Sequence, residues 1–117
     1  MSVLLVDDEE DLVATLAERL SLREIEAEWV TSGEGALEML NYKQFLVAVL
    51  DVKLPRMSGL ELKKKMESIA PGMKFIFMTG HGSEKDFVKG TAEAGSPYYL
   101  LKPVDIETLV DKIREIA

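Results

Sequence analysis

The sequence predicts an α/β fold, in which five parallel strands form one sheet and helices cover both of its faces. Strand-like and helix-like segments alternate five times along the 117 residues, which favours a doubly wound (βα)5 arrangement. Three of the strand-like segments are almost continuously apolar, as is typical of strands covered on both faces. The first, third, fourth and fifth strands are each followed directly by an acid, a threonine or a lysine, and in a parallel sheet those strand ends meet at a single edge.

The expected strands cover residues 2–6, 26–30, 45–50, 74–78 and 98–101. The first, third and fourth contain the continuous apolar runs. In the second strand, Glu26 and Glu28 alternate with Ala27 and Trp29, which indicates an edge strand. Pro97 precedes the fifth strand, and proline is confined to strand starts and sheet edges. We therefore expect the first, third and fourth strands in the middle of the sheet.

The helices have recognisable start signals. Patterns typical of capping boxes, Thr31-Ser32-Gly33-Glu34 and Ser58-Gly59-Leu60-Glu61, begin the second and third helices, and Asp105 is expected to cap the last. The first helix is expected at 9–22. Helical spacing predicts that the following residues of the first, third and last helices face the core: Leu12, Val13, Leu16, Leu20, Leu62, Met66, Ile69, Ile106, Leu109, Val110 and Ile113.

The fourth helix, expected at 83–94, has the weakest signal. Gly90 in its interior costs about 0.5–1 kcal/mol relative to alanine. Gly95 is a suitable residue to end it. A marginal helix beside the polar edge of the sheet is a candidate moving part.

Length and composition exclude several classes of protein. We expect residues 1–117 to form one domain. The absence of cysteine excludes thiol redox chemistry and thiolate metal sites. No apolar stretch approaches the roughly 20 residues of a membrane span, and no signal peptide precedes the first strand, so we expect a cytoplasmic protein with no membrane partner.

The net charge of -7 argues against direct nucleic-acid binding, which depends on lysine and arginine at phosphates. The one basic run, Lys63-Lys64-Lys65, lies on a predicted helix, and we interpret it as a solvated helix face. The charge pattern therefore favours protein partners.

The polar residues at the predicted sheet edge suit a divalent cation and a phosphoryl group. Asp7 and Asp8 follow the first strand, Asp51 the third, Thr79 the fourth and Lys102 the fifth. Two carboxylates 4 Å apart repel each other by about 4 kcal/mol at an effective dielectric near 20, which Lys102 and a bound cation would offset. Because the donors are oxygens, magnesium or manganese is favoured over zinc. A carboxylate here could also be a nucleophile that forms an aspartyl phosphate.

The sequence resembles the receiver domains of two-component response regulators, over the whole chain. The resemblance rests on four motifs in the family's order and spacing: Val6-Asp7-Asp8-Glu9, Asp51-Val-Lys-Leu-Pro-Arg-Met-Ser-Gly59, Met78-Thr79-Gly80, and Gly95 through Tyr99-Leu-Leu-Lys102-Pro103. It implies the flavodoxin-like strand order 2-1-3-4-5. It also implies a phosphoacceptor that assists only its own phosphorylation and dephosphorylation, rather than an enzyme.

The resemblance implies a role for each matching residue. Asp51 would accept the phosphoryl group and, with Asp8, ligate Mg²⁺ through its carboxylate. Lys53 would ligate the ion through its backbone carbonyl, and Asp7 mostly through water.

The resemblance also implies a switch. Lys102 would pair with the phosphoryl group, after a bond to Pro103 that is usually cis in the family. Thr79 would turn toward the phosphoryl group, and Tyr99 would change rotamer in step with it. Tyr98 should lie on the opposite face of the sheet and have no switch role.

The implied partner is a sensor histidine kinase or a phosphotransfer protein, and two copies of the family commonly associate through the fourth helix, fifth strand and last helix. Two alternatives remain open. A pseudo-receiver that only binds partners would require the loss of a site residue, and none is missing. A magnesium-dependent aspartyl phosphatase of the haloacid-dehalogenase kind would need an Asp-x-Asp motif and a cap insertion, and the sequence has neither.

Overall fold

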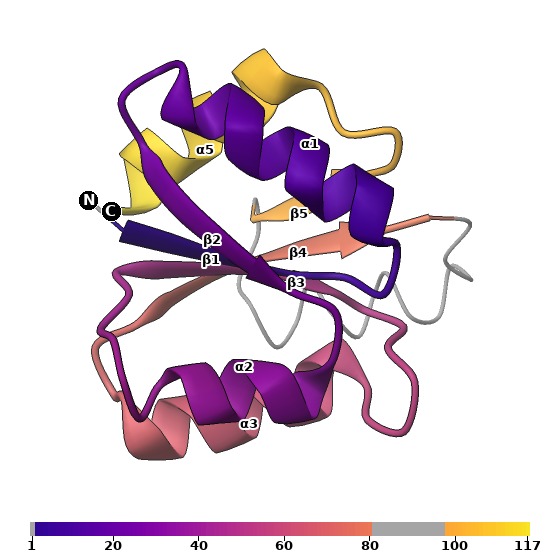
Figure 1. The fold of residues 1–117 in the computed structure, drawn as a ribbon, viewed down its shortest axis with the longest axis vertical. Helices are drawn as coiled ribbons and strands as arrows, with labels where there is room; N and C mark the ends of the chain where they lie inside the picture. Colours follow the sequence, from indigo (N-terminus) through magenta and orange to yellow (C-terminus); the bar gives the residue numbers. More distant parts are fainter. Residues whose placement is uncertain (1, 81–97) are drawn as a thin grey trace.

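The computed structural model describes residues 2–80 and 98–117, which form a parallel sheet between two layers of helices (Figure 1). The strands are β1 (Ser2–Val6), β2 (Glu26–Val30), β3 (Val47–Asp51), β4 (Lys74–Thr79) and β5 (Tyr99–Leu101). The described helices are α1 (Glu10–Ser21), α2 (Gly33–Met39), α3 (Gly59–Ile69) and α5 (Ile106–Ile116). The sheet order is β2-β1-β3-β4-β5 and every pairing is parallel, which confirms the predicted fold and the predicted edge strands. The expected helix at 83–94 lies outside the described residues.

The strand ends differ from the prediction in a way that bears on function. β3 extends to Asp51, which is paired in register with Met78, and β4 extends to Thr79, which is paired with Leu101. These polar residues are thus the last members of buried strands rather than the first residues of loops. Their backbones are held by the sheet, so their side chains have defined positions at its carboxyl edge.

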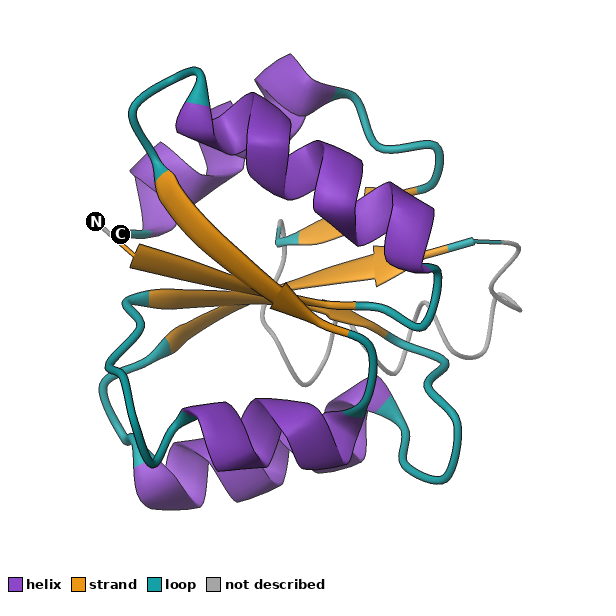
Figure 2. Ribbon diagram, in the orientation of Figure 1, coloured by secondary structure: helices purple, strands orange, loops and turns teal. Residues whose placement is uncertain are grey.

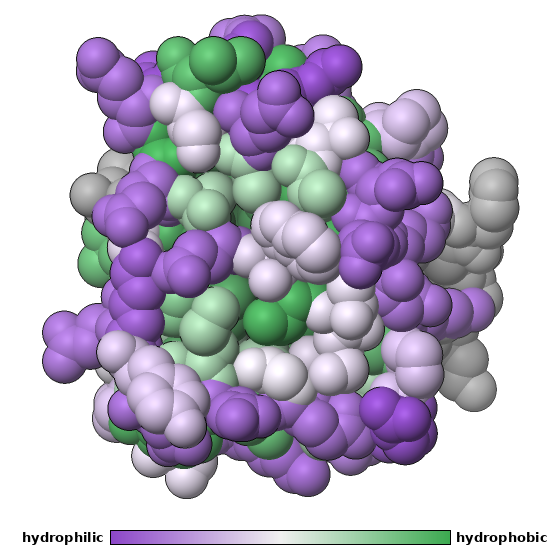
Figure 3. Space-filling view, in the orientation of Figure 1, coloured by the Kyte–Doolittle hydropathy of each residue, from purple (hydrophilic) through white to green (hydrophobic). Residues whose placement is uncertain are grey.

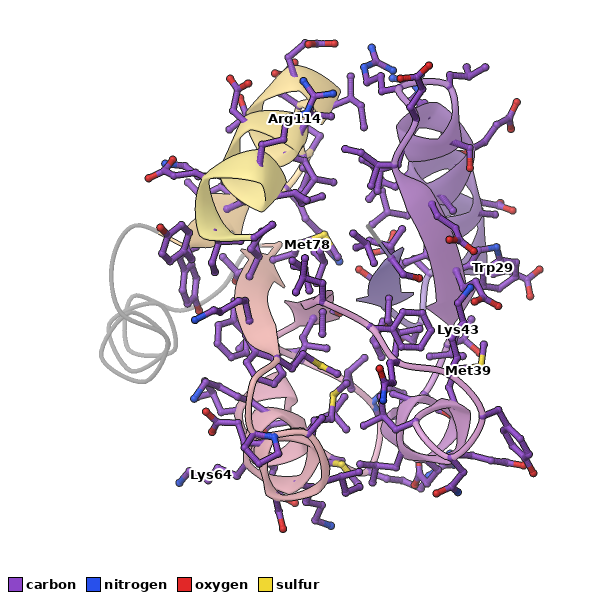
Figure 4. All side chains as sticks on the ribbon, turned by 90° about the vertical axis from the view of Figure 1, so that its left-hand side faces the viewer. Trp29, Met39, Lys43, Lys64, Met78 and Arg114 are labelled. Carbon is purple, nitrogen blue, oxygen red and sulfur yellow. The ribbon has the colours of Figure 1, made fainter. Side chains whose placement is uncertain are left out.

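The two faces of the sheet pack against different helices. Helices α1 and α5 cover one face, and α2 and α3 cover the other (Figures 1 and 2). Met78 points from β4 into the α1/α5 side (Figure 4), where it belongs to the same apolar core cluster as Leu109 and Ile113 of α5. The predicted apolar stripe of the last helix is confirmed, because its four residues, Ile106, Leu109, Val110 and Ile113, are buried.

One predicted core residue is wrong. Ile69 has an exposed fraction of 53%, whereas Leu62 and Met66 of the same helix are fully buried. The inward positions of α3 continue in steps of four residues, so Ala70 is the next residue to pack against the core. Ile69 lies beside that line, on the surface at the end of the helix. Leu12 of α1 is only partly buried, but it does contact the core.

Three described helices have a side chain that caps the amino end. Ser32 accepts a hydrogen bond from the backbone N of Gly35 at 3.0 Å, Ser58 from that of Glu61 at 3.1 Å, and Asp105 from that of Thr108 at 3.0 Å. The predicted caps at Ser58 and Asp105 are confirmed.

At α2 the cap is Ser32, so the capping box predicted from Thr31 does not form. The Glu34 side chain of that motif instead pairs with Arg56, 3.1 Å away.

Surface charges protect the β2 edge of the sheet. Lys43 lies beside β2 and forms ion pairs with Glu26 at 2.8 Å and with Glu28 at 2.5 Å (Figure 4). Charged side chains on an edge strand disfavour pairing with another sheet. In the space-filling view, pale and green side chains form a patch at the centre of the molecule, and hydrophilic side chains flank it on both sides (Figure 3).

The basic run on α3 is only partly solvated. The Lys63 side chain is 12% exposed, pairs with Glu67 at 3.0 Å and lies over the Phe75 ring. The expectation of a solvated face is therefore wrong for Lys63, because its aliphatic stem packs on the sheet. In the part of the chain that the structure describes, no helix is long and apolar enough to span a membrane.

Candidate functional site

The predicted polar residues come together at the carboxyl edge of the sheet. Asp7 directly follows β1, Asp51 and Thr79 end β3 and β4, and Lys102 directly follows β5. The backbone N of Lys102 donates a 2.7 Å hydrogen bond to the carbonyl of Thr79, so the strand pairing itself delivers the lysine to the site. The peptide bond between Lys102 and Pro103 is cis, as the resemblance implied.

The ammonium of Lys102 contacts three carboxylates. Its Nζ lies 2.6 Å from Asp7 Oδ2, 3.2 Å from Glu9 Oε1 and 3.6 Å from Asp51 Oδ2. The Lys102 side chain is 13% exposed and the two aspartates are buried, so the contacts with Asp7 and Asp51 are poorly screened by water, whereas the Glu9 side chain is 65% exposed. Residues from opposite ends of the chain are therefore joined into one charged cluster.

Burial and mutual repulsion alter the acid–base properties of the two buried aspartates. Burial, then the charge of Asp7, raises the pKa of Asp51 from 3.8 to about 6, against the opposing effect of Lys102. Burial likewise raises the pKa of Asp7. Burial alone would lower the pKa of the Lys102 ammonium, but its contacts with Asp7 and Asp51 raise it. Asp51 is thus an unusually basic carboxylate that is still mostly ionised at neutral pH.

Three acids at this edge fit a hard divalent cation. Asp7, Asp8 and Asp51 each offer a carboxylate oxygen, and these oxygens lie within 4.8 Å of one another. Asp7 Oδ1 accepts a hydrogen bond from the backbone N of Glu9, and the buried Oδ2 has an ion-pair contact with Lys102 Nζ at 2.6 Å but no well-aligned hydrogen bond from a described group. A metal ion would be a further partner for such a buried oxygen. An all-oxygen set of this kind suits Mg²⁺ or Mn²⁺.

The loop after Asp51 is fixed by a glycine whose role the motif alone did not reveal. The backbone N of Gly59 donates a 2.8 Å hydrogen bond to the carbonyl of Val52. A Cβ at Gly59 would lie 2.2 Å from the backbone carbonyl oxygen of Asp51, which is closer than atoms can approach. Gly59 therefore allows the start of α3 to pack directly against the end of β3. Lys53 lies in this loop, and its backbone N donates to Asp51 Oδ1 at 3.3 Å.

Thr79 and the two tyrosines lie as the strand pattern predicted. Thr79 is 2% exposed at the end of β4. Tyr99 packs on the α2/α3 side, with its ring centroid 6.0 Å from that of Phe77, and Tyr98 packs on the α1/α5 side. The prediction that these neighbours face opposite sides is confirmed.

Glu9 is a member of the cluster that sequence reasoning missed. In the sequence, Glu9 belongs to the Val6-Asp7-Asp8-Glu9 motif, and the motif implies no separate role for it. The available signal was its position at the start of α1, where glutamate is an unusual cap.

A 2-1-3-4-5 parallel sheet with acids and a lysine at its carboxyl edge is the architecture of CheY-like signalling domains of the flavodoxin-like fold. The chain belongs to the family of response regulator receiver domains, whose family model matches residues 3–114.

Individual regulatory proteins and receiver domains of known structure are also similar to this chain. The chain is 32% identical over 97% of its length to the uncharacterized transcriptional regulatory protein YesN of Bacillus subtilis, but it spans only 32% of that protein. The CheY-like receiver domain from Methanospirillum hungatei has a TM-score of 0.87 and 32% identity, with 97% of this chain and 90% of that one covered. A beryllofluoride-activated NtrC4 receiver domain dimer has a TM-score of 0.86 and 29% identity, with 97% and 93% covered.

Proposed function

We propose that this protein is a phosphorylation-dependent signalling switch, in which Asp51 accepts a phosphoryl group from a phosphohistidine of a sensor kinase or a phosphotransfer protein. One observation carries the proposal. Asp51 ends a buried strand with its carboxylate beside the acids Asp7 and Asp8 and 3.6 Å from the Lys102 ammonium. We further propose that residues 1–117 act as one receiver domain and that they meet their kinase in the cytoplasm.

The covalent step is an exchange of one bond at phosphorus. A carboxylate oxygen of Asp51 attacks, the P–N bond of a ring-protonated phosphohistidine breaks, and its electron pair returns to the nitrogen, leaving a neutral imidazole. The ionised carboxylate is a far stronger nucleophile for this attack than the protonated acid. Because the pKa of Asp51 is about 6, the group is ionised at neutral pH and yet more basic than an ordinary aspartate.

Mg²⁺ is the proposed cofactor, with Mn²⁺ as a substitute. The ligands would be the carboxylates of Asp8 and Asp51, the backbone carbonyl of Lys53, and Asp7 mostly through water. When bound, the ion would offset negative charge on the transferring phosphoryl oxygens.

Lys102 and Thr79 complete the proposed site. The ammonium is close enough to Asp51 to pair with a phosphoryl oxygen attached there, and the Thr79 hydroxyl can donate a hydrogen bond to another. A phosphoryl group adds charge and three acceptor oxygens, which would draw both side chains inward.

Tyr99 lies on β5, the strand that leads to Lys102, so a change in its rotamer would alter the surface formed by β5 and α5. That surface is the proposed site of association between two copies. The NtrC4 receiver, whose structure is described as a dimer, supports the association of two copies, and the choice of surface comes from the family resemblance. No nucleic-acid contact by this domain is proposed.

Mass spectrometry of the intact protein tests the function. Incubation with Mg²⁺ and phosphoramidate should add the mass of one phosphoryl group, and Asp51→Asn should abolish the addition. Asp111→Asn, at an exposed position of α5, is the matched control and should be labelled like the wild type. Steady turnover of the donor without a labelled protein would indicate a phosphatase. An unlabelled protein with no turnover would indicate a module that only binds partners.

A further inference from the structure

The residue immediately before α1 does not cap its helix, whereas the corresponding residues of the other described helices do. Glu9 is the N-cap residue of α1, with an extended backbone, yet its side chain makes no capping hydrogen bond. At the corresponding position of α2, α3 and α5, a serine or aspartate accepts a backbone hydrogen bond. Glutamate is a poor choice for this position, because capping favours short polar side chains. A local rule broken beside a functional site suggests that the residue has another task.

The Glu9 side chain instead reaches across the site. Its Oε1 accepts a 3.2 Å hydrogen bond from Nζ of Lys102, which is 93 residues away in the chain. The ammonium lies 2.6 Å from Asp7 and 3.2 Å from Glu9, but 3.6 Å from the phosphoacceptor Asp51. In the resting protein, the lysine therefore lies closer to Asp7 and Glu9 than to the carboxylate that it would serve.

We propose that Glu9 is a positioning residue that holds Lys102 in the resting state and so limits the rate at which Asp51 is phosphorylated. This inference rests on the proposed function. The ammonium has three N–H donors. Asp7 is a proposed partner of the metal ion, so metal binding weakens its hold on the lysine, whereas Glu9 remains as a competing anion. Lys102 must therefore leave Glu9 before its ammonium can pair fully with the phosphoryl group on Asp51.

The effect depends on where the Glu9 carboxylate lies, next to Lys102, and not only on its negative charge. The Glu9 side chain is 65% exposed, so it can leave Lys102 without being buried elsewhere. A release of this kind costs little, which suits a contact that must open on every phosphorylation. Removing the contact should raise the maximal phosphorylation rate about three- to fivefold, which is the upper part of the range for a partly exposed charge pair.

Three substitutions separate this role from a general effect of charge. Glu9→Gln removes the charge and keeps the shape. Glu10→Gln removes the same charge one residue further on, at an exposed position outside the lysine cluster of the described residues. Glu9→Asp keeps the charge, but the shorter side chain is a preferred N-cap and should turn onto the helix end, away from Lys102.

The experiment measures the phosphorylation rate of each variant against donor concentration, with Mg²⁺ present, for phosphoramidate and for the more highly charged acetyl phosphate. Glu9→Gln and Glu9→Asp should both raise the maximal rate three- to fivefold with both donors, and Glu10→Gln should leave it near that of the wild type. A change confined to the half-saturating concentration of acetyl phosphate, or equal effects of Glu9→Gln and Glu10→Gln, would mean a general field effect and would overturn the proposal.

A second measurement keeps failure of the inference distinct from failure of the proposed function. The NMR signal of the Lys102 ammonium, recorded without metal or donor, should shift in both Glu9 variants and not in Glu10→Gln. An unchanged signal would show that the contact does not hold the lysine in solution, and would overturn the inference alone. A wild type that takes up no phosphoryl group from either donor would overturn the proposed function, and the inference with it.

Discussion

Replacing Asp51 with asparagine should stabilise the metal-free protein at neutral and alkaline pH. The fold forces this carboxylate into a buried position beside Asp7, and burial together with that neighbouring charge raises its pKa to about 6. A pKa above the unfolded value of 3.8 means that the folded state holds the proton more tightly. Ionising Asp51 therefore costs stability, and Asp51→Asn removes that cost.

The size and pH window of the effect follow from the two pKa values. The difference between 3.8 and about 6 corresponds to about 3 kcal/mol of stability. The cost is absent below pH 3.8, grows as the pH rises through this window and is complete above pH 6. With a urea m-value of about 1–3 kcal/mol/M, the unfolding midpoint of Asp51→Asn should exceed that of the wild type by about 1–3 M at pH 8.

Urea unfolding followed by fluorescence measures this directly, because the chain has a single tryptophan, Trp29, which packs against the core. Both proteins are treated with EDTA, and the difference in unfolding free energy is recorded between pH 4 and pH 8. Asp111→Asn, at an exposed position of α5, should show no such pH-dependent gain. Equal stability of Asp51→Asn and the wild type at pH 8, or a difference that grows as the pH falls, would refute the reasoning.

Three further predictions test other parts of the structure. Mg²⁺ at 100 times its Kd should stabilise the wild type by about 2.7 kcal/mol, and the same concentration should have a much smaller effect on Asp8→Asn in thermal unfolding. Gly59→Ala should cost about 3 kcal/mol, the upper end of the range for overpacking, because its Cβ would collide with the backbone carbonyl of Asp51. Gly72→Ala, with nothing within 4 Å, should change the free energy of unfolding in urea by less than about 0.5 kcal/mol. Ile113→Ala should cost about 2–5 kcal/mol, and Ile69→Ala under about 1 kcal/mol, by the same method.

The fold and the site edge could be predicted because both depend on short-range patterns. Continuous apolar runs identify buried strands, and parallel strands place their carboxyl ends together whatever the connecting helices do. Asp7, Asp51 and Lys102 were therefore placed side by side without any knowledge of their contacts. Strand order was a different matter, because the apolar runs indicated only which strands were central. The order came from the resemblance to a known family.

The predictions for the end of α3 and the start of α2 were wrong because the sequence pattern fitted two neighbouring residues equally well. On α3, both three- and four-residue steps extend the apolar stripe after Met66, so the pattern led to Ile69 where the packing uses Ala70. At the start of α2, two adjacent hydroxyl residues fit the cap position, and the structure uses Ser32 rather than Thr31. In each case, the choice depends on where the sheet ends in space, which a local pattern does not contain.

The contact between Glu9 and Lys102 belongs to a third category, in which the sequence contains an anomaly but not its meaning. A glutamate at a helix start is unremarkable as composition, and becomes informative only when three other helices are seen to have capped ends. Lys102, which Glu9 contacts, lies 93 residues away in the sequence. The two residues come together only because β1 and β5 belong to the same sheet. A helix start without a capping side chain thus indicates that the N-cap residue interacts elsewhere, and the three-dimensional structure identifies Lys102 as its partner.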